Sequence, residues 1–308
     1  MAKKIVVEIA EGLGNQLFMY AFAYSLSKKI NYDLMIDKTS GYSKKKNLMR
    51  KHQKYMLDNL NINQKYASKN DVYDNRFKRY VKKIELFLDN FFSKKKFIIE
   101  KYIKINERKI SLNIPPINKK NLSDNLYVQG HFEDQNYFKS FRKDFLKMYK
   151  PLNKYLIHNE EIIRKLKNTN SVSIHIRQHR FTEQMHEKKK KFNNDMTIKY
   201  TNELIEYIKK SIIFFEKNLN NPEFFIWSND FSNINQHFDS KKFNYVTGND
   251  VINDFNLFSH AKHFIVGGST FHWWGAWLNE NPNKICVCPH NLNPSGNNNF
   301  YPKEWLRI

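Results

Sequence analysis

A glycine-containing segment near the start of the chain has the residue types of a ligand-binding turn. Segment 11–18, with Gly12 and Gly14, follows the apolar run 5–7 and precedes the helix-like run 19–26. Glycine is scarce, with nine in 308 residues, and it permits positive φ angles and close backbone approaches. A strand–turn–helix unit of this kind directs backbone N–H groups and the positive end of the helix at a ligand. Leu17 occupies the place of the third glycine in the dinucleotide-binding fingerprint, so a plain turn that uses glycine for tight packing is the alternative.

Polar residues also alternate along the strand-like run 172–177. Its apolar residues point to one face, while Ser173, His175 and Arg177 point to the other. Polar groups in a central parallel strand are costly unless something polar meets them, and the planar arginine fork suits phosphate. The alternative is a structural arginine and histidine paired with local carboxylates.

Two more strand ends carry polar residues. The run 224–227 is followed by Ser-Asn-Asp ending at Asp230, which we expect to cap the next short helix. The segment 267–271, Gly-Gly-Ser-Thr-Phe, forms a glycine-rich turn whose amides and hydroxyls suit a diphosphate. Ser269 or Thr270 is equally suited to be the N-cap of the following helix. The tryptophans of 273–277 lie at helical spacing and are expected in the core.

These candidates require an α/β framework to position them. In the second half, short apolar runs alternate with helix-like segments, notably 155–167, 196–215, 251–261 and 271–278, which predicts a parallel sheet. The first half begins in the same way, becomes lysine-rich with helices and long loops between about 43 and 118, and resumes its sheet at 125–130. Pro151 marks the predicted boundary between two α/β domains.

The charge of the chain favours anionic partners. Lysine and arginine number 52 against 30 aspartates and glutamates, a formal net charge of +22. Nucleotides, nucleic acid and anionic lipid headgroups all fit this excess, although each lysine run, 44–46, 94–96 and 188–191, taken singly is best read as a solvated face. A basic nucleic-acid-binding protein is therefore the rival class, but the basic runs lack interleaved aromatics and no nucleic-acid motif is present. We expect no nucleic-acid partner.

The sequence has no recognisable targeting segment, and its longest apolar run, 17–26, is too short to span a bilayer. Cys286 and Cys288 have no second ligand pair nearby, so buried thiols are expected instead of a metal site. These features predict a cytoplasmic protein, with peripheral contact with the anionic inner face of the membrane as a further expectation.

Four segments, in this order, resemble the bacterial α-1,2-fucosyltransferases of glycosyltransferase family 11. They are 12–18, 172–177, 225–230, and the stretch from Asp254 through 269–278, Ser-Thr-Phe-His-Trp-Trp-Gly-Ala-Trp-Leu. Segment 130–138 is similar to a weaker family segment. Together they span nearly the whole chain, and the glycine-rich opening is specific in combination with the Ser-Thr-Phe-x-Trp-Trp block.

The resemblance implies a GT-B-like fold of two Rossmann-type domains that face a central cleft. Residues 1–150 would form the acceptor-side domain, with a lysine-rich helical insertion, and 151–308 the donor-binding domain. The implied reaction transfers L-fucose, with inversion, from GDP-fucose to the 2-hydroxyl of a galactose-containing glycan of the O-antigen, lipopolysaccharide or capsule type. No cofactor or metal is implied, in agreement with the absence of an Asp-x-Asp pair. A different nucleotide sugar is the alternative within enzymes.

The resemblance also assigns roles to individual residues. Arg177 is the implied anchor of the β-phosphate, which stabilises the charge of departing GDP, and Asn15 is a second catalytic candidate that orients the acceptor or the diphosphate. The implied donor-binding residues are Gly14, His175, Asp254, Ser269, Thr270 and Phe271. The general base is open among Glu11, His131 and Glu133.

One departure from the family pattern bears on the donor. The family usually has His-x-Arg-Arg-x-Asp, whereas this chain has Gln178 in place of the second arginine and Arg180 in place of the acidic residue. The first arginine, Arg177, is retained. The changed pair leaves open how the base or sugar of the donor is held, and so which sugar is moved.

Overall fold

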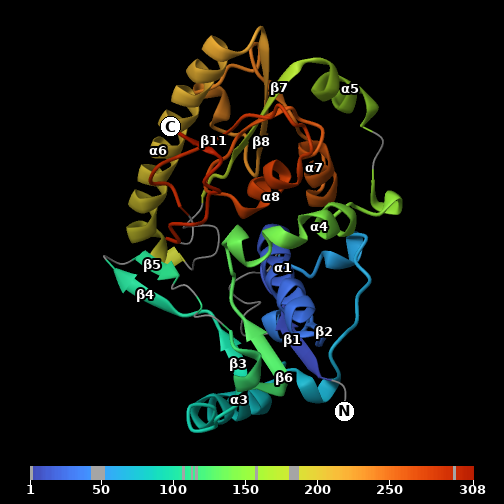
Figure 1. Ribbon diagram of the computed structural model, residues 1–308. Helices are drawn as coiled ribbons and strands as arrows, with labels where there is room; N and C mark the ends of the chain where they lie inside the picture. Colours follow the sequence, from blue (N-terminus) through green and yellow to red (C-terminus); the bar gives the residue numbers. More distant parts are fainter. Residues whose placement is uncertain are drawn as a thin grey trace. The chain divides into compact units, whose positions relative to one another are not determined.

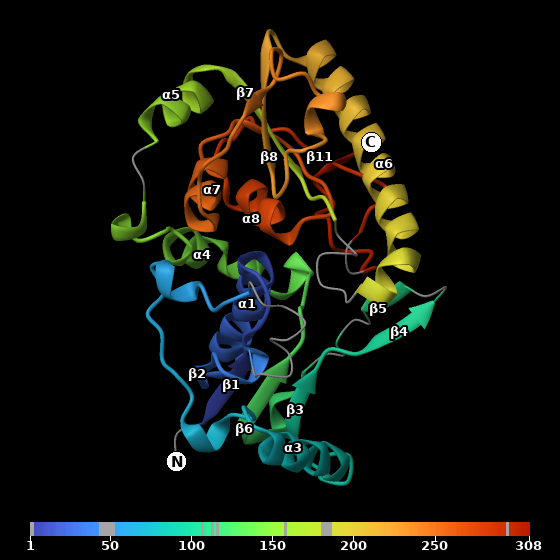
Figure 2. The same cartoon turned by 180° about the vertical axis from the view of Figure 1, so that it is seen from behind.

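The computed structural model divides the chain into two compact units, which are described separately (Figures 1 and 2). The described residues are 3–42, 53–105, 108–111, 114, 117–156, 159–179, 187–293 and 296–308. Unit 1 consists of Met1–Lys150 and Ser295–Phe300, and unit 2 of Pro151–Pro294 and Tyr301–Ile308. The short segment Ser295–Phe300 therefore packs with unit 1, whereas the predicted boundary assigned it to the second domain. Arg180 and the lysines of 44–46 lie outside the described residues.

Unit 1 is built on a parallel four-stranded sheet of order β2-β1-β6-β3. Its core strand β1 is almost completely buried, as a central parallel strand must be. The strands are β1 (Lys4–Glu8), β2 (Asp33–Asp37), β3 (Lys95–Ile99) and β6 (Leu122–Gln129); the helices are α1 (Leu13–Ile30), α3 (Arg76–Leu88) and α4 (Arg142–Met148).

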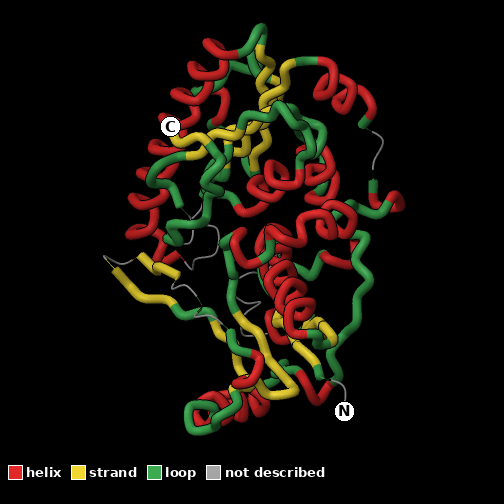
Figure 3. The backbone as a smooth tube through the Cα atoms, in the orientation of Figure 1, coloured by secondary structure: helices red, strands yellow, loops and turns green. Residues whose placement is uncertain are grey.

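The lysine-rich region of unit 1 differs from its prediction of helices and loops. It contains α3, but it also supplies the edge strand β3 and an antiparallel hairpin of β4 (Tyr102–Ile105) and β5 (Arg108–Ser111) (Figure 3). Lys95 and Lys96 do not prevent strand formation, because Phe97 and Ile98, which follow them in β3, are buried. The lysine-rich, amphipathic composition of this region therefore did not reveal its three strands.

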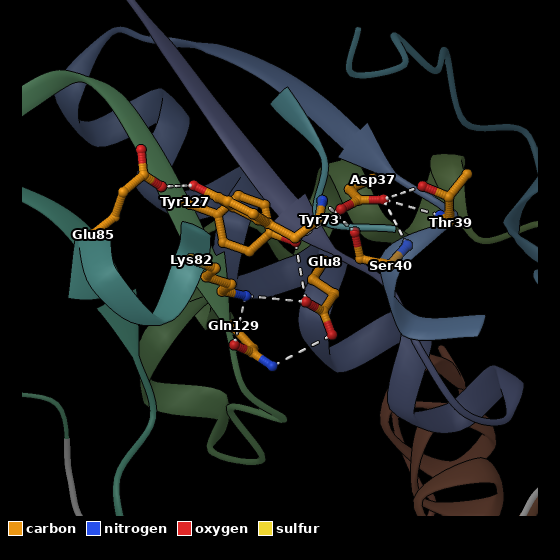
Figure 4. A network of polar contacts seen from close by, with 9 residues as sticks. All are labelled: Glu8, Asp37, Thr39, Ser40, Tyr73, Lys82, Glu85, Tyr127 and Gln129. Carbon is orange, nitrogen blue, oxygen red and sulfur yellow. Dashed lines mark hydrogen bonds and ion pairs between the residues drawn. The ribbon is translucent and has the colours of Figure 1, made fainter. Parts of the chain in front are cut away.

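A buried polar network fixes α3 on one face of this sheet (Figure 4). The Tyr127 hydroxyl lies 2.8 Å from Asp37 Oδ2 and 3.0 Å from Glu8 Oε2. The ammonium of Lys82, on α3, donates to Gln129 Oε1 at 2.8 Å and lies 3.3 Å from Glu8 Oε2. Burial, followed by the charges of Glu8 and Asp37, raises the pKa of Tyr127, so its hydroxyl remains protonated and available as a donor.

Unit 2 has a parallel six-stranded sheet of order β12-β11-β10-β7-β8-β9. The long helix α6 covers one face, where Ile174, Leu204 and Ile208 belong to one buried cluster. The strands are β7 (Asn170–Ile176), β8 (Pro222–Ser228), β9 (Asn244–Tyr245), β10 (His263–Ile265), β11 (Cys286–Cys288) and β12 (Leu306–Arg307); the helices are α5 (Glu160–Asn168), α6 (Glu187–Asn218), α7 (Val251–Phe258) and α8 (Thr270–Leu278).

The two parallel sheets with covering helices confirm the predicted α/β class with one parallel sheet in each unit. The helix predicted at 155–167 is shorter at its start: α5 begins at Glu160, and Tyr155 belongs to a separate 3-10 turn, Asn153–Tyr155. The predicted buried tryptophans are confirmed: Trp273, Trp274 and Trp277 lie in the core. Cys286 and Cys288 are buried free thiols, also as predicted.

No helix among the described residues combines the length and the apolar character that a membrane span requires.

Candidate active site

The carboxyl edge of the unit 2 sheet brings together most of the predicted donor residues. In open α/β sheets, ligands bind at this edge. Arg177 directly follows β7, and the Gly267–Phe271 turn follows β10, the neighbouring strand. Asp254 lies in the first turn of α7, which contacts α8, the next helix along the chain.

His175 lies on the face of β7 opposite α6, as the strand alternation predicted. Its ring contacts Phe258 and Phe271 edge-on, with centroids 6.1 and 6.0 Å apart. Burial, followed by the charge of Arg177, lowers the pKa of His175 to about 3, so the imidazole is neutral near pH 7. Its Nδ1 atom is shielded from solvent, and no hydrogen-bond partner for it lies among the described residues. Such an atom is costly to bury, and a carboxylate-paired histidine, the structural alternative, does not describe it.

Asp254 is a second polar group with unmet hydrogen-bonding capacity. Within the part of the chain that the structure describes, its buried Oδ1 atom accepts no hydrogen bond, and the buried indole N–H of Trp227 has no acceptor. Burial raises the pKa of Asp254 to about 6, although Asn249 and Trp227 lie close enough to oppose the shift. The Trp227 N–H thus approaches the carboxyl group without adopting hydrogen-bond geometry.

The glycine-rich turn before α8 is shaped by packing against α6. A Cβ atom on Gly268 would lie 2.4 Å from the Tyr200 hydroxyl oxygen, and one on Gly267 would lie 2.9 Å from Leu204. Ser269 is the N-cap of α8, and its Oγ accepts from the His272 N–H at 3.4 Å. Thr270 is the first helical residue, so the backbone amides of the turn lie at the positive end of α8.

Phe271, predicted to belong to the diphosphate turn, packs against aromatic neighbours. Its ring lies 5.8 Å from that of Phe255 and 5.1 Å from that of Phe258, centroid to centroid. It therefore forms an apolar wall beside His175.

The loops after β7 and β8 are joined by the residue that departs from the family pattern. Gln178 is buried; its backbone N–H donates to Asn229 Oδ1 at 2.8 Å and its side chain donates to the Asp230 carbonyl at 2.7 Å. Asp230 does not cap the next helix as predicted: its carboxylate accepts from the Ser232 N–H at 2.8 Å and lies 2.8 Å from His179 Nε2. The Ser232 N–H, followed by His179, lowers the pKa of Asp230 to about 2.

A separate polar cluster in unit 1 includes three predicted residues. Glu11 adopts φ 68°, a left-handed conformation that is unusual for a residue other than glycine. Its side chain accepts from Asn15 Nδ2 and lies 3.2 Å from His131 Nε2. The Tyr102 hydroxyl lies 3.0 Å from His131 Nδ1. Strained backbone of this kind is often retained where a side chain has to be aimed.

The glycine segment itself differs from the predicted turn. Helix α1 already begins at Leu13, so Gly14 and Asn15 are in its first turn, and Gly12 has φ −81°. The residue with positive φ is Glu11, whose carbonyl accepts from Gln16 Nε2 at 2.8 Å and from the Tyr42 hydroxyl at 2.9 Å. These two bonds stabilise a conformation that the sequence had assigned to glycine.

Glu133, the third base candidate, is buried in unit 1. Its backbone carbonyl accepts from Asn297 Nδ2 at 3.3 Å. Its charge acts on Tyr102, whose hydroxyl lies beside His131: burial, then Glu100, then Glu133 raise the pKa of that hydroxyl.

Two polar residues of these sites had not been identified from the sequence as candidates. His272 is fully buried, and its Nε2 lies 2.8 Å from Ser173 Oγ. The sequence could have indicated it, because it lies three residues after Ser269, the predicted N-cap. Tyr102 had no comparable signal, because its hairpin carries no motif. Among the described residues, no cluster of histidine, cysteine and acidic side chains is suited to hold a metal ion.

Comparison with known proteins decides the family. The sequence model described as glycosyl transferase family 11 matches residues 4–308. The chain belongs to glycosyltransferase family 11. It is therefore a fucosyltransferase-family glycosyltransferase that acts on a glycan, and this assignment favours the enzyme over the nucleic-acid-binding alternative.

Relatives of this family 11 protein are similar over most of their length. The chain is 29% identical to an Escherichia coli protein named alpha-1,2-colitosyltransferase, with 99% of this chain and 98% of the relative covered. It is 25% identical to the E. coli O-antigen biosynthesis glycosyltransferase WbnK, with 91% and 92% covered. A solved structure of a mutant of Arabidopsis thaliana FUT1 in complex with GDP has a TM-score of 0.48 at 9% identity, with 95% of this chain and 72% of that chain covered.

Proposed function

We propose that this protein is an inverting galactoside α-1,2-fucosyltransferase. It would move L-fucose from GDP-fucose to the 2-hydroxyl of a galactose-containing glycan of the O-antigen, lipopolysaccharide or capsule type. The observation that carries the proposal is the family 11 match over residues 4–308. The acceptor hydroxyl would attack the anomeric carbon from the face opposite GDP, which inverts its configuration.

A colitosyl donor is the second candidate, favoured by the name of the E. coli relative. Colitose is fucose without its 3-hydroxyl, so the two donors differ by one polar group. A site that hydrogen-bonds a hydroxyl discriminates strongly against the substrate that lacks it, whereas an apolar pocket discriminates weakly. Competition between GDP-fucose and GDP-colitose for one acceptor distinguishes these two donors.

On the donor side, Arg177 would contact the β-phosphate. Its position directly after β7 supports this role, since a permanently charged group at the carboxyl edge offsets the charge that develops as GDP leaves. The amides and hydroxyls of Ser269 and Thr270 would bind the diphosphate at the positive end of α8. With these groups the proposed reaction needs no metal, and we expect turnover to be unchanged by EDTA.

The donor nucleoside would satisfy the polar groups that the protein leaves unpaired. His175 is neutral near pH 7, and its buried Nδ1 has no partner among the described residues, so it suits a neutral hydrogen bond and adds no positive charge. Asp254, expected near the nucleoside, can accept from base N–H groups once ionised.

On the acceptor side, we assign the proton-accepting role to the pair of Glu11 and His131, with Asn15 as an orienting residue. The support is geometric: a carboxylate aimed by a strained backbone lies 3.2 Å from an imidazole. General-base catalysis typically contributes about 10²–10⁴-fold. Glu11→Gln should therefore lower kcat by at least about 100-fold, whereas Glu133→Gln should leave it within about threefold. The reverse pattern would move the base to Glu133.

Turnover of GDP-fucose by Arg177→Ala tests the donor assignment. Loss of one group that stabilises developing charge typically costs about 10²–10³ in kcat. Arg164→Ala, at an exposed position of α5, is the control for loss of an arginine. A near-normal kcat for Arg177→Ala would remove it as the phosphate anchor.

Thermal shifts with GDP, GDP-fucose, GDP-mannose and UDP-sugars test the nucleotide. Ligands that bind the folded state raise its stability. Stabilisation by UDP-sugars without stabilisation by GDP compounds would contradict the proposed donor.

A further inference from the structure

Helix α3 presents a continuous apolar surface to solvent. Five of its residues and the two phenylalanines that follow it form what we call the α3 stripe: Phe77, Tyr80, Ile84, Phe87, Leu88, Phe91 and Phe92. Phe77 is 75% exposed, Phe87 64% and Phe91 73%. At 3.6 residues per turn, the five members within α3 fall within an arc of roughly 100°.

The amphipathicity of α3 is inverted relative to an ordinary surface helix, which turns its apolar side to the core. Its inward side carries Lys82, buried in the network of Figure 4, and Glu85, whose carboxylate accepts from Lys96 Nζ at 2.6 Å. Leu86 is its apolar contact with the cluster around Tyr127. The hydrogen bonds and ion pairs of the inward side therefore hold α3 in an orientation that exposes its apolar side to solvent.

The α3 stripe has a basic border. Arg76 and Lys83 are exposed, and each lies four residues before a stripe member, so they border the stripe on the helix surface. Lys94, after the stripe, is exposed as well. The acidic residues of this segment are engaged inward: Glu85 is paired with Lys96, and Asp89 is buried and accepts from the Lys96 N–H at 2.6 Å.

We propose that the α3 stripe is a docking surface for an anionic lipid bilayer, with its aromatic side chains inserted at the headgroup level. Phenylalanine and leucine on one face with lysine and arginine beside them are the composition of interfacial helices. Each lysine or arginine near an anionic surface adds favourable electrostatic energy. Charge complementarity favours the bilayer over a second copy of this chain, because a two-fold contact would bring the two basic borders together.

The inference goes beyond the proposed transfer reaction and does not depend on the donor. It places the enzyme where a lipid-linked glycan would be presented, but α3 lies outside the proposed donor and acceptor groups. Transfer to a soluble acceptor should therefore be unchanged in every variant below. A change in transfer and a change in membrane binding thus test the two proposals separately.

Vesicle flotation tests the binding. The wild type should bind vesicles of phosphatidylcholine with roughly 30 mol % phosphatidylglycerol, and it should bind pure phosphatidylcholine vesicles at least about tenfold more weakly. Phe87→Ser combined with Phe91→Ser should reduce the partition coefficient on anionic vesicles by at least about tenfold. Ile198→Ser combined with Ile213→Ser, at exposed positions of α6, is the matched control and should bind as the wild type does.

Charge and insertion are tested in the same assay. Arg76→Glu with Lys83→Glu should weaken anionic binding, whereas Lys209→Glu with Lys210→Glu, at exposed positions of α6, should weaken it less. In the Phe87→Trp variant, the fluorescence of the introduced tryptophan should be quenched by brominated phosphatidylcholine in anionic vesicles. A tryptophan placed at Ile213 should not be quenched.

Equal binding of the wild type and the Phe87/Phe91 double variant would overturn the proposal, as would absence of quenching at position 87. Analytical ultracentrifugation separates the other occupant: a wild-type dimer that the double variant abolishes, without vesicle binding, would assign the α3 stripe to a second copy of the chain. Circular dichroism should show that each variant is folded. We expect this because the substituted side chains are exposed and do not contribute to the core.

Discussion

The carboxyl group of Asp254 lowers the stability of the folded protein when it ionises, and Asp254→Asn measures this effect. Burial raises its pKa from the ordinary 3.8 to about 6. Between these values the folded protein binds more protons than the unfolded chain, so the contribution of Asp254 to stability falls as the pH rises. At about 1.4 kcal/mol per unit of pKa difference the full effect would be about 3 kcal/mol. The side chain is only partly buried, and solvent screening reduces this to about 1–2 kcal/mol.

Urea denaturation of Asp254→Asn and the wild type at several pH values between 4 and 7.5 is the assay. Other titrating groups are common to both proteins, so the difference in free energy of unfolding isolates this position. Asp254→Asn should gain about 1–2 kcal/mol on the wild type across this range, and most of the gain should appear below about pH 6. Asp195→Asn, at an exposed position of α6, controls for loss of a carboxylate. A difference that is constant with pH, or one that favours the wild type as pH rises, would refute the raised pKa.

Three further predictions concern packing. Lys82→Met should lower the free energy of unfolding by about 3 kcal/mol, because it leaves a buried carboxylate without its cation; urea denaturation beside the exposed Lys83→Met measures this, and equal effects would contradict it. Gly268→Ala should destabilise the protein by about 1–3 kcal/mol. Adding Tyr200→Phe removes the oxygen that would lie 2.4 Å from the new Cβ atom, and it should restore at least half of the lost free energy of unfolding. If nothing is restored, this clash is not the cause. Burial raises the pKa of the Cys288 thiol to about 12, so Ellman's reagent should label it only as fast as the protein unfolds, and rapid labelling of native protein would show an exposed thiol.

The framework of unit 2 was predictable because buried parallel strands leave a strong local signal. Apolar runs of strand length, each followed by a polar or glycine-rich turn, gave β7, β8 and β10 and the edge at which Arg177 lies. Alternation along β7 also predicted which face carries His175. These features depend on a few consecutive residues, which is why one sequence sufficed.

Other features depend on partners that are distant in sequence. The positive φ at Glu11 is stabilised by Gln16 and Tyr42, so the sequence rule that assigns such a conformation to glycine failed there. Asp230 satisfies the Ser232 N–H and His179 instead of a helix end. The inverted orientation of α3 follows from Lys82 reaching Glu8 across the sheet, a contact that helical periodicity cannot reveal.

The return of Ser295–Phe300 to unit 1 sets the order in which the chain can be completed during synthesis. Phe300 is fully buried, with its ring centroid 6.3 Å from that of Phe18 on α1, and Asn299 Nδ2 donates to Asp134 at 3.0 Å. The core around α1 therefore lacks one of its aromatic side chains until almost the whole chain has left the ribosome. Unit 1 is first in sequence, yet unit 2 has almost all its residues available before unit 1 can close.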